Sequence, residues 1–93
     1  MAKYSTLHIL NKAPDHSRTR QCLAALAPDD ALLLIENGVL LLASGSAPAT
    51  GQLFALAPDI NARGLRAHAD QVQSVDYNDM VSLSLAAERV ISW

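Results

Sequence analysis

The stretch at residues 29–42, DDALLLIENGVLLL, decides the fold. Its apolar residues 31–35 show no polar alternation and are too few for a typical helix, so they predict a strand buried on both faces. The run stops at Glu36, Asn37 and Gly38 before it resumes. We expect Gly38 to turn the chain in a backbone conformation that other residues reach only with strain. This turn follows the strand's carboxyl end, where an open α/β sheet holds its ligand and partner crevices.

Outward from this stretch, short apolar runs alternate with helical patterns. Further strands are predicted at residues 6–10, 52–56 and 72–76, and a short strand or tail at residues 90–93. Residues 39–43 could begin a helix, whereas SGSAPATG at residues 44–51 predicts a mobile loop.

Capping residues mark the predicted helices. The first helix begins at Asp15 or Ser17 and runs to about residue 27. A one-turn helix is capped by Asp59 and ends at Gly64, which suits a left-handed position after a helix. The last helix begins after residue 76 or 78, each of which is a good cap.

Strands that alternate with helices at this spacing predict one α/β domain over residues 1–93. We expect a flavodoxin-like parallel sheet of four to five strands, with right-handed crossovers and helices on both faces.

The composition favours an assembly. Hydrophobic residues make up 51% of the chain and charged residues only 17%, compared with about 25% charged in an ordinary domain. So few charges predict an oligomer with a large apolar interface, although a compact monomer with exposed alanines and leucines is the alternative. The net charge of −2 and the scattered basic residues argue against direct nucleic-acid binding.

The sequence predicts a cytoplasmic protein. Glu36, Asn37 and Gly38 interrupt the only candidate membrane span, and the first residues are too polar for a secretion signal. A single cysteine cannot form an internal disulfide, which fits a reducing compartment.

In this order, several segments resemble the DsrH/TusB family of small sulfur-relay proteins. They are LHILNKAP at 7–14, Cys22, DDALLLIENGV at 29–39, FALAPDINARGL at 54–65, VDYNDMVSL at 75–83 and Trp93. The resemblance implies a DsrE-like fold and work in passing sulfane sulfur, toward 2-thiouridine in tRNA or within dissimilatory sulfur oxidation. It also implies a complex with two paralogous subunits of the DsrE/DsrF or TusD/TusC kind, often a dimer of heterotrimers, and a sulfur acceptor of the DsrC/TusE type.

Cys22 is the candidate for sulfur chemistry. A relay needs a thiolate that attacks a sulfane sulfur, holds it as a persulfide and passes it on. Cys22 lies at the shoulder of its helix's apolar face, one turn after Arg18, which would favour the thiolate. The resemblance implies that the principal carrier cysteine belongs to the DsrE or TusD paralogue, and that Cys22 has a DsrH-like position, which favours the sulfur-oxidation branch. An accessory persulfide site and a buried packing residue both stay open.

The histidines predict no metal site. His8 could orient a ligand or contact a partner, but a hydrogen-bonded structural role fits it better. His16 and His68 are expected in loops, and no set of side chains has the spacing of metal ligands. No glycine-rich phosphate loop is present, and we expect no cofactor.

The carboxylates predict structural roles. Asp29 and Asp30 are adjacent in a turn, which suits solvation better than shared acid–base chemistry. Asp76 and Asp79 suit the first turn of a helix, where negative charge is favourable.

These features are compatible with two functions. In the first, the chain is a subunit of a sulfurtransferase complex that takes part in persulfide transfer, without being catalytic alone. In the second, it is a scaffold that completes the oligomer and docks the sulfur acceptor, with Cys22 purely structural.

Overall fold

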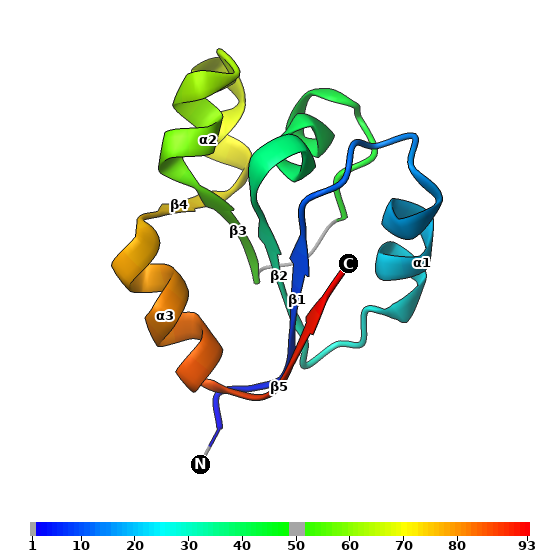
Figure 1. Cartoon of the computed structure of the whole chain (residues 1–93), viewed down its shortest axis with the longest axis vertical. Coiled ribbons are helices and arrows are strands. Elements are labelled where there is room, and N and C mark those ends of the chain that lie inside the picture. Colours follow the sequence, from blue (N-terminus) through cyan, green and yellow to red (C-terminus); the bar gives the residue numbers. More distant parts are fainter. Residues whose placement is uncertain (1, 49–51) are drawn as a thin grey trace.

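Five parallel strands form one sheet in the computed structural model, which describes residues 2–48 and 52–93 (Figure 1). The strands are β1 (Tyr4–Leu10), β2 (Ala31–Leu34), β3 (Leu53–Leu56), β4 (Gln73–Val75) and β5 (Ala87–Ser92). Their order across the sheet is β4-β3-β2-β1-β5, and every neighbouring pair is parallel. The predicted α/β fold class is therefore confirmed.

Helices cover both faces of this sheet, as predicted (Figure 1). They are α1 (Ser17–Ala25), the 3₁₀ helix η1 (Glu36–Ala43), α2 (Ala57–Ala62), the 3₁₀ helix η2 (Arg66–Gln71) and α3 (Tyr77–Leu85). From β1 to β4 the chain moves in one direction, so right-handed crossovers place the connecting helices on one face. The step from β4 to β5 runs back across the sheet, which places α3 on the other face.

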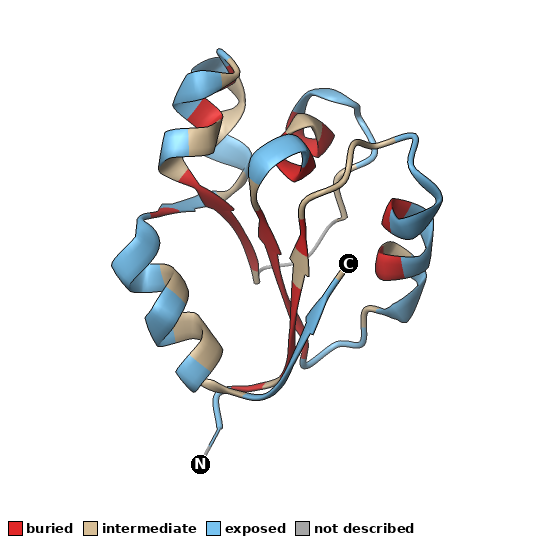
Figure 2. Ribbon diagram, viewed as in Figure 1, coloured by how far each residue is buried: buried red, intermediate tan, exposed pale blue. Residues whose placement is uncertain are grey.

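Two apolar clusters form the core, one on each face of the sheet. Leu32 and Leu34 belong to the cluster under α1, η1 and α2, whereas Ala31 and Leu33 belong to the cluster under α3. All four residues of β2 are buried, which confirms the prediction of a strand covered on both faces. In Figure 2 the central strands are buried, while α3 has no buried residue and β5 is largely exposed.

The prediction for Gly38 is wrong in its reason. The residue with a left-handed backbone is Glu36, with φ of 49°, and Gly38 does not have a positive φ. What requires a glycine is space, because a Cβ at this position would overlap the Leu10 carbonyl oxygen and lie 3.0 Å from the carbonyl carbon. The start of η1 therefore packs directly against the end of β1.

Several predicted caps and boundaries also differ. The imidazole of His16 caps α1, in place of Asp15 or Ser17, because its Nδ1 accepts the Arg18 backbone N–H at 3.0 Å. The helix α2 begins at Ala57, with a proline in its first turn, so Asp59 lies inside the helix and does not cap it.

Two other boundaries and the location of one histidine also differ from the predictions. Helix α1 ends at Ala25 rather than residue 27, β5 begins earlier than residue 90, and η2 contains His68, which was expected in a loop.

The predictions for Gly64 and Asp76 are confirmed. Gly64 follows α2 with φ of 65°, in the left-handed region. Asp76 caps α3 in a reciprocal pair with Asp79, with N–O distances of 2.7 and 3.1 Å. Residues 44–48 are not helical, and residues 49–51 of the predicted loop lie outside the described residues. No helix within the described ranges is long and apolar enough to cross a membrane.

Candidate functional site

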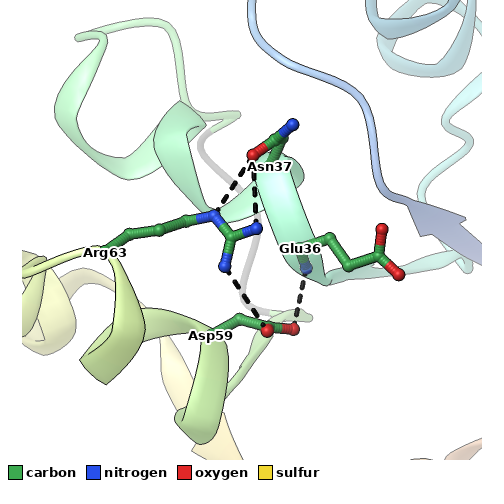
Figure 3. A network of polar contacts seen from close by, with 4 residues as sticks. All are labelled: Glu36, Asn37, Asp59 and Arg63. Atoms are coloured by element: carbon green, nitrogen blue, oxygen red, sulfur yellow. Dashed lines mark hydrogen bonds and ion pairs between the residues drawn. The ribbon is translucent and has the colours of Figure 1, made fainter.

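A polar network lies where β2 and β3 reach their carboxyl ends, at the edge that the sequence indicates (Figure 3). Asp59 Oδ2 accepts the Glu36 backbone N–H at 2.7 Å, and Asp59 Oδ1 lies 3.5 Å from Arg63 Nη1. Arg63 also donates from Nε and Nη2 to Asn37 Oδ1, at 3.2 Å each. The network joins the first turn of η1 to α2.

This network holds Glu36 in its left-handed conformation, which is strained for a residue with a side chain by roughly 1–2 kcal/mol. With its N–H bound to Asp59, the Glu36 side chain points away from the network (Figure 3). The carboxyl edge therefore presents an exposed carboxylate. The four described residues of this network include no thiol or hydroxyl group.

Cys22 lies elsewhere, inside the core on the α1 face. Its side chain is 0% exposed and belongs to the same cluster as Leu10 and Val39. Burial raises the pKa of the Cys22 thiol to about 12. The accessible shoulder position expected from the helical wheel is therefore not observed, and burial outweighs the effect of Arg18. In this conformation the thiol is neutral and out of reach of a sulfur donor.

Labelling of Cys22 by a thiol probe at pH 8 should be slow. We expect a rate at least roughly 100-fold below that of an exposed thiol, because the thiolate fraction and access are both reduced. A matched control is Ala24→Cys in a Cys22→Ser background, since Ala24 is exposed on the same helix. Equal rates for the two cysteines would show that Cys22 is accessible and reactive.

A second polar group is buried between β1, β2 and the residue after β5. His8 Nε2 lies 2.9 Å from Asp30 Oδ2, and the Trp93 indole N–H donates to His8 Nδ1 at 3.0 Å. Asp30 also accepts the Ala27 backbone N–H at 3.0 Å. The prediction that His8 is hydrogen-bonded is confirmed. The prediction that both aspartates are solvated is wrong for Asp30, which is buried, and right for Asp29, which is exposed.

The environment of Asp30 sets its charge. Burial alone would raise the pKa of the carboxyl group, but hydrogen bonds from His8 and Ala27, with the His8 charge, hold it below the usual value. Asp30 is therefore a carboxylate at neutral pH.

The described residues line a groove beside α3 and contain no cluster of metal ligands. Within residues 2–48 and 52–93, no three His, Cys, Asp or Glu side chains lie close enough to bind a metal ion. The groove, of about 560 Å³, lies between α3 and the sheet. Tyr4 and Phe54 line it in edge-to-face contact, with Lys3 and Asp79 as its charged groups.

Comparison with known proteins agrees with this fold. A protein TusB from Klebsiella pneumoniae (strain 342) is 34% identical, with 94% of this chain and 99% of the relative covered. A protein TusB from Pectobacterium parmentieri is 29% identical with the same coverage. The solution structure of protein Tm0979 from Thermotoga maritima superposes with a TM-score of 0.62 at 25% identity, covering 84% of this chain and 88% of that one. The model of the family described as DsrH like protein matches residues 12–90. The chain therefore belongs to the DsrH/TusB family.

Proposed function

We propose that this chain is a cytoplasmic subunit of a sulfur-relay complex serving 2-thiouridine synthesis in tRNA, and that it contributes a docking surface and not the sulfur-carrying thiol. The burial of its single cysteine carries the second half of this proposal, because a neutral, enclosed thiol is a poor sulfur nucleophile. The first half is supported by the family and by full-length relatives named TusB. Cys22 then serves as a packing residue.

The partners we propose are two paralogous subunits of the TusD/TusC or DsrE/DsrF kind, in a heterohexamer, with a TusE- or DsrC-type sulfur acceptor. Support comes from the distribution of exposed apolar side chains. Within the described chain, the exposed large hydrophobic residues are Tyr77, Val81 and Leu85 on α3 and Val90 and Ile91 on β5. The three on α3 are spaced by four residues and share one side of the helix. Val90 pairs with Leu7 and projects to the same side of the sheet as α3, whereas Ile91 pairs with His8 and projects to the opposite side. We call the surface formed by Tyr77, Val81, Leu85 and Val90 the α3–β5 face.

The helices on the two sides of the sheet differ in their charged residues. Helix α3 contains no basic residue, and its acidic residue Asp79 is engaged in the capping pair. Helix α1, on the other face, exposes Arg18 and Arg20 and no large apolar side chain. On α3, an apolar partner contact therefore requires little desolvation of charge, and the exposed charged residues beside it are Glu88 and Arg89 on β5.

The test uses the organism that encodes the chain. Deletion should abolish 2-thiouridine, measured by mass spectrometry of tRNA nucleosides, and the wild-type chain should restore it. Cys22→Ser should restore it as well, because the carrier cysteine belongs to a paralogue. Leu85→Glu should fail to restore it and should fail to co-purify with the two paralogues. Gln21→Glu, at an exposed position on α1, is the matched control and should behave as the wild type.

Each half of the proposal can fail separately. Unchanged 2-thiouridine after deletion would remove the tRNA role and point to sulfur oxidation. Loss of rescue by Cys22→Ser, with the complex intact, would make this cysteine a persulfide carrier. Normal co-purification of Leu85→Glu would place the partner contacts away from the α3–β5 face.

A further inference from the structure

The imidazole of His8 is hydrogen-bonded to both Asp30 and Trp93 on the α1 side of the sheet. Its side chain is 2% exposed, and both of its ring nitrogens have a hydrogen-bond partner. The indole of Trp93 also stacks on it, with ring centroids 6.0 Å apart and an interplanar angle of 19°. Neither the docking surface nor the thiol uses this group.

The partners determine which nitrogen of His8 carries the proton. An indole N–H is only a donor, so His8 Nδ1 must be an acceptor and carry no hydrogen. The hydrogen of the neutral ring is then on Nε2, where it donates to the Asp30 carboxylate. This tautomer satisfies all three side chains.

We propose that protonation of His8 undocks the Trp93 side chain. A second proton can add only to Nδ1, which converts the acceptor into a donor that faces the indole N–H. The hydrogen bond between them is lost, and the indole N–H turns to water. The imidazolium keeps its bond to Asp30, which becomes an ion pair, so the ring stays while Trp93 leaves.

The charged groups around His8 support a local change. Asp30, immediately before β2, stays ionised because its pKa lies below the usual value. Lys12 holds the Trp93 carbonyl oxygen at 2.9 Å, and the Trp93 backbone N–H donates to Ile9 at 2.9 Å. These backbone contacts do not depend on the imidazole. On the neighbouring elements, the titratable or charged residues that remain are the neutral thiol of Cys22 and the exposed Arg18 and Arg20 on α1, the buried Tyr4 on β1, and the exposed Glu88 and Arg89 on β5.

Undocking would open one side of the core. Trp93 packs against the cluster that contains Leu10 and Cys22. Its release would expose part of this cluster while β5 stays paired with β1. The group therefore couples one proton to the exposure of an apolar surface.

The test needs no label, because Trp93 is the only tryptophan in the sequence. The wild-type chain is titrated from pH 8 to 5 by tryptophan fluorescence and by NMR of the His8 ring and the indole N–H. We expect one common midpoint, a red-shifted emission, and a loss of indole N–H protection of at least about tenfold relative to free tryptophan. Far-UV circular dichroism should not change.

Variants identify the group that titrates. His8→Gln should remove the fluorescence transition, whereas His16→Gln and His68→Gln should retain it. The proposal is overturned if the indole N–H stays protected when the NMR signals of His8 show an imidazolium, a measurement that needs only the wild type. It is also overturned if the transition coincides with loss of secondary structure, or if it persists in a folded His8→Gln variant.

Discussion

Gly38→Ala should lower the free energy of unfolding by about 3 kcal/mol, or prevent folding altogether. The added Cβ would overlap the Leu10 carbonyl oxygen, a backbone atom that cannot rotate away. Relief would require η1 to move off the end of β1, and with it the buried Val39 and Leu41. Urea unfolding followed by circular dichroism measures the change.

Two other glycines provide the control. Gly45 and Gly64 have positive φ, but a Cβ added at either position would have no heavy atom within 4 Å beyond its chain neighbours. Gly45→Ala and Gly64→Ala should therefore each cost only about 1 kcal/mol of backbone strain. A Gly38→Ala variant as stable as these two would mean that η1 adapts to the methyl group.

Asp30→Ala should lower the free energy of unfolding by about 3 kcal/mol as well. It removes the acceptor for both His8 Nε2–H and the Ala27 backbone N–H, and it leaves donors without a partner in or near the core. Asp29→Ala is the matched control. Asp29 is adjacent and exposed, so its replacement should change stability by less than about 0.5 kcal/mol.

The same carboxylate predicts a dependence on pH. Because the folded pKa of Asp30 lies below the usual value, its contribution is complete above the unfolded carboxyl pKa of about 3.9. It is lost as the pH falls through the folded pKa. The wild type should therefore lose more stability than Asp30→Ala between pH 5 and acid pH. Parallel slopes for the two proteins would show that Asp30 is not held below its usual pKa.

The strands could be predicted because their signals are local. The unbroken apolar run of β2 indicates burial on both faces whatever lies beside it, and the cap at Asp76 depends only on its own helix. The buried pair of His8 and Asp30 was not predicted, although the pairing of β1 with β2 contains a signal for it. His8 pairs with Leu32, and Asp30 lies two residues before Leu32, so the two side chains project to the same face of the sheet. Two polar residues on one buried face of neighbouring strands predict a pair.

The remaining features depend on contacts between distant segments. The left-handed Glu36 is held by Asp59 from another element, so no local pattern indicates it. The need for glycine at position 38 comes from the path of β1, which the local sequence does not describe. The burial of Cys22 depends on η1, whose residues complete the same cluster, and a helical wheel of α1 contains no information about them.

The place of β5 beside β1 has a consequence for how the chain folds. These two strands come from opposite ends of the described chain, yet they pair along most of their length. The ordering of β5 must therefore close a loop that contains nearly all the other elements, and the entropy of that closure delays it relative to the pairing of β1 with β2. We infer that β1 keeps an open edge until late in folding. Local stability should follow this order of strand pairing. The amide hydrogens of β5, which pairs late, should therefore exchange before those of β2 and β3.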